Sequence, residues 1–296
     1  MIDGYDEMLK SFYKRTAVKI IGYIFITALL EMGAILNILS DKYWTFMWIT
    51  CIVPLTVSRF RHLQHLLFID LLSCRFRVIK EELKNIARFT KLENNKFITK
   101  NNSFYDGLYN KIYSIKMEYN ILWETSLLIN KSFGFSQLLN LLQNFVQLTC
   151  DLYSLYSFLY VNNLENILPL VFQICPTLVV VVLVLKACEI CLEEVRYIGF
   201  LLHNIEKDID DERINVLTEN FSLQILHEPL VFSVSGFFSM DFMFLKTMIA
   251  SITTYMVIFI QFMPKSDEQQ QQLNSTNATF EMTSTSTTVA TTTIIV

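Results

Sequence analysis

The chain has 296 residues, 52% of them hydrophobic, and carries only 7 Gly and 5 Pro to interrupt helices. A mean hydropathy of +0.38 is too apolar for an ordinary soluble domain, so the composition favours an all-α membrane protein. The net charge of −4 excludes no class by itself, because the position of each charge matters more than the sum.

Five stretches are predicted to cross the membrane as helices, in a multi-pass all-α arrangement. The first follows a basic segment and is too long for the apolar part of a signal peptide, so it is expected to stay in the membrane. The fourth is the most apolar, with no charge along its length. The spans cover about Ile20–Leu39, Tyr43–Ser58, Phe133–Val161, Ile167–Leu185 and Asp241–Phe262.

Amphipathic helices are predicted between these spans, on the cytosolic side. They cover Leu63–Phe89, Leu108–Leu128 and Lys186–Arg213, with a loop over Thr90–Asp106 and a mixed segment from Ile214 to Phe238. We therefore expect a transmembrane domain over residues 1–263, with cytosolic anchor helices at about 60–130 and 187–235. A Gln-, Ser- and Thr-rich tail, residues 264–296, is expected to be disordered and extracellular.

The distribution of basic residues predicts the orientation. Of 24 Lys and Arg, only Lys42 and Lys265 fall on the proposed outer side, leaving 24 − 2 = 22 on the inner side. The N-terminus is thus expected in the cytosol and the C-terminus outside the plasma membrane. Glycosylation sequons at Asn274 and Asn277 agree, although a third at Asn101 lies in a segment expected inside.

A polar stripe runs along the third predicted span. Its members alternate in spacings of three and four, which places them on one helical face: Gln137, Asn140, Asn144, Gln147, Asp151 and Ser154. Such a face must meet neighbouring helices or a watery cavity, since a carboxylate at membrane depth costs roughly 2.5–3.5 kcal/mol.

Asp151 is interpreted either as part of a structural pair or outer interface, or as a polar contact in an outward-facing ligand pocket. A pocket with aromatic walls and few polar anchors suits small organic molecules. Glu31 is expected to pair across helices or to join this pocket. The candidate pocket residues are Trp48, Gln147, Asp151, Tyr153, Tyr156 and Gln173.

Catalytic, metal and cofactor chemistry is not predicted. Cys188 and Cys191 form a CxxC without a second ligand cluster, so helix packing is the better interpretation. Histidines 62, 65, 203 and 227 fall in segments expected in the cytosol, where packing or solvated faces explain them best. Basic residues are interleaved with acidic ones, which disfavours nucleic-acid binding.

The last span ends in a distinctive pattern. Thr254 and Tyr255 are followed by five apolar residues, Met256–Ile260, and then by Gln261 and Phe262. This pattern, together with Phe221–Pro229 upstream, resembles the terminal signature of the insect gustatory receptors. The resemblance implies a seven-helix chemoreceptor that acts as a ligand-gated, non-selective cation channel opened by small-molecule tastants. On that mapping the five spans correspond to the family's last five helices, so an N-terminally shortened member is expected.

The same resemblance implies a homo- or hetero-tetramer in membrane lipid, with the pore lined by the last helix. Thr254, Ile258 and Gln261 share one helical face and are the candidate pore-lining residues. Tyr255 and Phe262 lie on another face and are expected to pack against neighbours. The alternatives are a truncated non-conducting subunit and a receptor linked to G proteins; a transporter is less favoured because no paired broken helices are evident.

Overall fold

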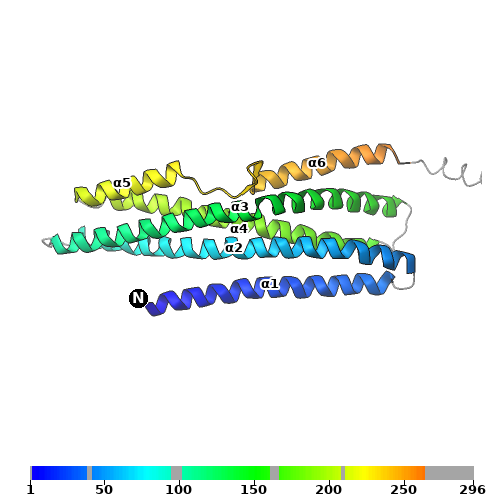
Figure 1. Ribbon diagram of the computed structural model, residues 1–296, viewed down its shortest axis with the longest axis horizontal. Helices are drawn as coiled ribbons and strands as arrows, with labels where there is room; N and C mark the ends of the chain where they lie inside the picture. The colour runs from blue at the N-terminus through cyan, green and yellow to red at the C-terminus, as the bar shows by residue number, and fades with distance from the viewer. Residues whose placement is uncertain (1, 39–41, 95–101, 161–166, 208–210, 264–296) are drawn as a thin grey trace, which may run out of the picture. The chain divides into compact units, whose positions relative to one another are not determined.

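The computed structural model describes residues 2–38, 42–94, 102–160, 167–207 and 211–263 (Figure 1). Over these residues the predicted all-α class is confirmed. The helices are α1 (Ile2–Ile38), α2 (Lys42–Asn94), α3 (Asn102–Tyr160), α4 (Ile167–Lys207), α5 (Glu212–His227) and α6 (Phe242–Gln261).

The chain divides between Ala250 and Ser251 into two compact units. The first contains α1 to α5, a short hairpin and the start of α6, and the second contains the rest of α6. Within the first unit, α2, α3 and α4 lie side by side, α1 packs on α2 and α4, and α5 packs on α3 and α4 (Figure 1).

Two predicted pairs of segments are single helices. α2 contains both the predicted second span and the amphipathic helix predicted after it. α3 contains both the amphipathic helix predicted over Leu108–Leu128 and the third span. The loop expected over residues 90–106 is therefore wrong at both ends, since 90–94 and 102–106 are helical. At 53 residues α2 is about 80 Å long, far more than the ~30 Å thickness of a bilayer core.

One predicted helix is two. The expected helix over Lys186–Arg213 breaks, because α4 ends at Lys207 and α5 begins at Glu212. Asp211 caps α5, and its carboxylate accepts a hydrogen bond from the Arg213 N–H at 2.9 Å. Hydrogen bonds from the Arg213 guanidinium hold the pKa of the Asp211 carboxyl below its usual value. The acidic residues before Arg213 were assigned from the sequence to the end of one helix, whereas Asp211 is the N-cap of the next helix.

A two-stranded hairpin lies in the segment that the sequence left as mixed. β1 (Ser233–Val234) pairs antiparallel with β2 (Phe238–Ser239) across a turn in which Ser235 and Gly236 have φ of 51° and 76°. α3 supports the hairpin closely at Gly134, where an added Cβ would lie 3.0 Å from the Ser235 nitrogen.

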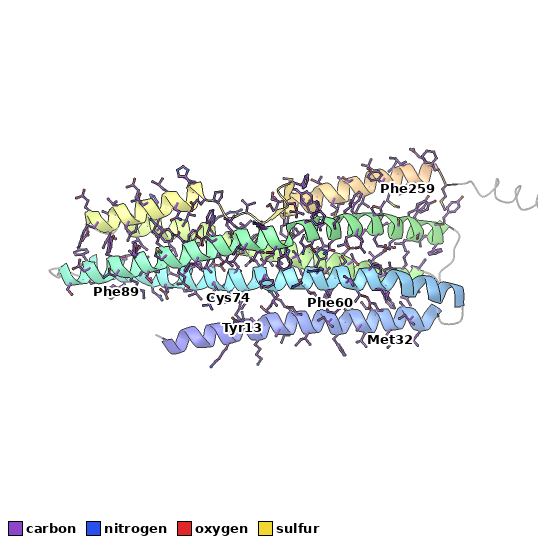
Figure 2. All side chains as sticks on the ribbon, viewed as in Figure 1. Tyr13, Met32, Phe60, Cys74, Phe89 and Phe259 are labelled. Atoms are coloured by element: carbon purple, nitrogen blue, oxygen red, sulfur yellow. The ribbon has the colours of Figure 1, made fainter. Side chains whose placement is uncertain are left out.

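The main core joins α2, α3, α4 and α5 in the part expected to be cytosolic. Tyr119 of α3 is fully buried between Phe76 of α2, at a ring distance of 5.6 Å, and Phe221 of α5, at 5.3 Å. Two residues labelled on α2 in Figure 2 illustrate the change along this helix: Phe60 is 52% exposed and Cys74 is 1% exposed.

Among the described residues, three helical stretches are long and apolar enough to cross a membrane. They are Lys10–Leu36 in α1, Ile167–Ile205 in α4 and Phe242–Gln261, the whole of α6. These agree with the first, fourth and fifth predicted spans and support an all-α membrane protein. The spans predicted within α2 and α3 do not meet this measure of composition and stay predictions.

Candidate functional site

The polar stripe predicted on α3 faces a matching stripe on α2. Gln137 and Asn144 are each 1% exposed, and Asn144 Nδ2 lies 2.8 Å from His62 Nε2. The α2 residues recur at spacings of four and three, as an α-helical face requires. We call this interface the α2–α3 polar seam: Ser58, His62 and His65 of α2 with Gln137, Asn140 and Asn144 of α3.

Aromatic contacts lie at the end of the seam formed by His65. The His65 ring stacks on Phe133 of α3 at 5.1 Å, and Phe68 contacts the same ring at 5.4 Å. His62 and His65 are 1% and 3% exposed. Their burial agrees with the interpretation of these histidines as packing residues, but the contact of His62 with Asn144 of the α3 stripe was not predicted. The spacing of Ser58, His62 and His65 was the signal that could have found it.

Beside the seam, Arg59 connects three helices. Its side chain is only 6% exposed, and it forms an ion pair with Glu31 of α1. The same guanidinium donates to the Gln173 carbonyl oxygen of α4 at 3.1 Å and to Thr177 Oγ1 at 3.3 Å. Glu31 therefore pairs across helices, the first of the two alternatives that the sequence left open.

α4 carries Pro176 at this level, so its backbone has no N–H there to complete the helical pattern. Two carbonyls of the same turn accept side-chain donors from other helices: Tyr23 Oη of α1 donates to the Pro176 oxygen at 2.9 Å, and Arg59 of α2 donates to the Gln173 oxygen at 3.1 Å. The proline thus coincides with the point where α1 and α2 are both attached to α4.

A cavity of about 90 Å³ opens between α1 and α2 next to the ion pair. Its polar wall is formed by Tyr23, Thr27, Glu31, Thr56 and Arg59. The volume corresponds to a few water molecules, at about 30 Å³ each, and is too small for a drug-sized ligand.

Part of the predicted pocket is brought together. Asp151 is 6% exposed, and its carboxylate accepts a hydrogen bond from Gln147 Nε2 at 2.8 Å. These two residues are one turn apart on α3, and Gln173, whose backbone carbonyl binds Arg59, lies on α4.

The other four predicted pocket residues lie on three different helices. Tyr153 and Tyr156 are half-buried on α3, and the side chain of Gln173 is buried on α4. Trp48 lies in α2, but its side chain falls outside the described part of the structure. A complete pocket that includes these residues stays a prediction.

The candidate pore residues lie on α6 and just after it. Thr254, Tyr255, Ile258, Gln261 and Phe262 are all exposed in the single chain. The packing role predicted for Tyr255 and Phe262 is thus not tested within one chain. The sequons at Asn274 and Asn277 lie outside the described residues.

Chemistry based on metal ions gains no support from the geometry. Over the described part of the chain, no three His, Cys, Asp or Glu side chains are grouped to hold a metal ion. Cys188 and Cys191 are fully buried and unbridged in the core, as expected for helix packing.

Long helices with apolar outer surfaces, joined by buried polar contacts, define a multi-pass α-helical membrane protein. The family described as 7tm Chemosensory receptor matches residues 4–265, and the chain belongs to this family. Two similar proteins from Drosophila melanogaster agree. One is designated gustatory receptor 2a and is 25% identical over 276 residues. The other is gustatory receptor 23a, 29% identical over 172 residues.

These matches cover 84% and 54% of this chain. They cover only 63% and 43% of the two relatives, so the chain spans less than two thirds of the length of either protein. The resemblance to the gustatory receptors, stated from the terminal signature, is confirmed at the level of the family.

Proposed function

We propose that this chain is a subunit of a ligand-gated, non-selective cation channel that small-molecule tastants open. Its family supports a chemosensory role. The observation that carries the proposal is the buried group around Arg59, which connects helices α1, α2 and α4. A ligand bound among these helices can alter their packing, and such a change is what opens a gated channel.

The ligand is proposed to bind in the outer part of the membrane domain, near Asp151, Gln147 and Gln173. Asp151 and Gln147 offer a hydrogen-bonding pair that is largely shielded from water. Tyr153 and Tyr156 provide aromatic surface on the same helix. This combination suits an organic ligand with a few polar groups on an apolar body.

Current recorded from cells that express the chain tests the ligand site. Asp151→Asn should raise the concentration of an activating tastant needed for half-maximal current by about tenfold, the effect of losing roughly 1.4 kcal/mol of binding. Leu142→Ala is the control, since Leu142 lies on the exposed face of α3, opposite the polar stripe. Equal sensitivity of the Asp151 and Leu142 variants to every activating compound would place the ligand elsewhere.

The conduction path is proposed to follow α6 in a homo- or hetero-tetramer, where Gln261 from each subunit would line the pore without fixed charge. Gln261→Ala should then change conductance or ion selectivity at normal surface expression, whereas Tyr255→Phe should disturb assembly more than permeation. Altered permeation in the Tyr255 variant alone would assign the pore to the other face of α6.

The channel proposal itself is tested by expressing the chain alone and joined to the upstream helices of a relative. Tastant-evoked current within milliseconds, in cells without G-protein signalling, is the expected result. A response that requires G proteins would support a G-protein-linked receptor, and a chain that reaches the surface but never conducts would support a non-conducting subunit.

The proposed orientation has the N-terminus in the cytosol and the C-terminus outside the plasma membrane. The distribution of basic residues supports the cytosolic assignment. Two of them, Arg77 and Lys80 of α2, form ion pairs with Glu194 of α4 beyond the predicted spans. An epitope after Val296 should be labelled on intact cells, and one before Met1 should be labelled only after permeabilisation. The opposite pattern would overturn this orientation.

A further inference from the structure

The α2–α3 polar seam contains more hydrogen-bonding atoms than its side chains can satisfy among themselves. Asn144 and His62 contact each other directly, and Gln137 lies near His62 without meeting hydrogen-bond geometry. Among the described residues, the buried atoms of the seam that have no partner are Ser58 Oγ, His62 Nδ1, His65 Nδ1, Gln137 Oε1, Gln137 Nε2 and Asn140 Nδ2.

These atoms are both donors and acceptors. With the Asn144 amide nitrogen donating to His62 Nε2, the proton of the neutral His62 ring resides on Nδ1, which becomes a donor. Gln137 offers an amide donor and a carbonyl acceptor, and Ser58 offers a hydroxyl that serves as either. A molecule that completes this set must therefore donate and accept hydrogen bonds and carry no net charge.

Close contacts between the helices favour a small molecule. Asn144 Nδ2 and His62 Nε2 are already at 2.8 Å, and the His65 ring stacks on Phe133 at 5.1 Å, so α2 and α3 touch directly at two points of the seam. Buried polar groups in this situation are commonly joined by water, which forms two to four hydrogen bonds in a small volume.

We infer that the α2–α3 polar seam is an internal binding site for ordered water molecules, held by Ser58, His62, His65, Gln137, Asn140 and Asn144. These waters bridge α2 to α3 in addition to the direct contact between Asn144 and His62. Contacts through water rearrange more easily than close apolar packing, so the seam is more adaptable than the core around Tyr119. The inference does not depend on the proposed channel activity.

Radiolytic hydroxyl-radical footprinting tests this, because radicals formed from bound water oxidise the side chains that contact it even when these are buried. The purified full chain in lipid nanodiscs is irradiated, and oxidation is measured residue by residue. His62 and His65 should be oxidised within about threefold of the exposed His203, while the buried Phe76 and Phe221 should react at least tenfold more slowly. Protection of both seam histidines to the level of Phe76 would overturn the inference.

Variants separate bound water from a general loosening of the fold. Gln137→Leu and Asn140→Leu remove the polar walls and fill space, so each should reduce His62 oxidation severalfold while Phe76 stays protected. Gln64→Leu, a matched change on the exposed face of α2, should leave His62 oxidation unchanged. Unchanged His62 oxidation in both seam variants would contradict the inference, and a variant that exposes Phe76 is replaced by the milder Gln137→Met.

Discussion

Replacing Arg59 by Met should be among the most damaging single changes in the membrane domain. The Arg59 side chain is 6% exposed and serves Glu31, the Gln173 carbonyl and Thr177 together. Its removal leaves the Glu31 carboxylate without its cation and takes one donor from each of the two α4 oxygens. Removing one partner of a buried ion pair typically costs about 3–5 kcal/mol. On the scale of soluble domains this lowers the melting temperature by roughly 6–20 °C.

The assay is thermal unfolding of the detergent-solubilised chain, followed by the loss of the monodisperse peak on size exclusion. Arg59→Lys should be intermediate, because an ammonium keeps the charge but does not reach three acceptors as a guanidinium does. Glu31→Gln combined with Arg59→Met should be more stable than Arg59→Met alone, since the second change removes the unpaired carboxylate.

Arg61→Met is the matched control, two residues away on the exposed side of α2, and should change stability by no more than about 0.5 kcal/mol. Equal melting temperatures for the Arg59 and Arg61 variants would refute the assignment of Arg59 as the residue that joins α1 and α2 to α4. Strictly additive effects of the two changes at Glu31 and Arg59 would refute the ion pair itself.

Three further predictions concern other parts of the fold. Asp211→Ala should destabilise α5 by about 1 kcal/mol through loss of its cap. Because the folded pKa of Asp211 is lowered, its contribution is present at neutral pH and lost as the pH falls through that pKa, as urea unfolding at several pH values would reveal. Burial and the neighbouring charge of Glu82 raise the pKa of Glu118, so Glu118→Gln should stabilise the chain at neutral pH and lose this advantage in acid. Gly134→Ala should destabilise by up to about 2 kcal/mol, since its Cβ would lie 3.0 Å from the hairpin, whereas Gly107→Ala, with nothing within 4 Å, should stabilise α3 by up to about 1 kcal/mol in the same melting assay.

The stripe on α3 could be predicted from the sequence because its spacing holds over several turns of one helix. Its partner on α2 was missed although it follows the same rule. Ser58, His62 and His65 fall beside Arg59 and Arg61, and this cluster of charge was interpreted as the end of a span in the cytosol. A local rule of this kind assigns a residue to a side of the membrane, but it does not indicate which helix packs against it.

Helix boundaries were predicted well where apolar periodicity was strong and poorly where charge was dense. The run of acidic residues before Arg213 continues a helical pattern of composition, and nothing in that pattern distinguishes a helix interior from a new cap at Asp211. The hairpin around Ser235 and Gly236 rests on two residues with positive φ and on support from Asn130, whose amide donates to the Val231 oxygen. Such contacts span about a hundred residues of sequence and leave no short-range signal.

The seam also explains why α2 and α3 are not apolar enough, on average, to count as membrane spans by composition, whereas α1, α4 and α6 are. Mean hydropathy averages over all faces of a helix, whereas lipid would contact only the outward face. On α3 the polar residues Gln137 and Asn144 are buried, while four apolar residues of the opposite face are at least half exposed: Phe135, Leu139, Leu142 and Val146. On α2, Val53, Val57 and Phe60 are exposed in the same way beside the buried Ser58 and Arg59. This inside-out distribution is the one that a helix needs in order to cross a bilayer within a bundle, and it favours the two spans that composition alone does not detect.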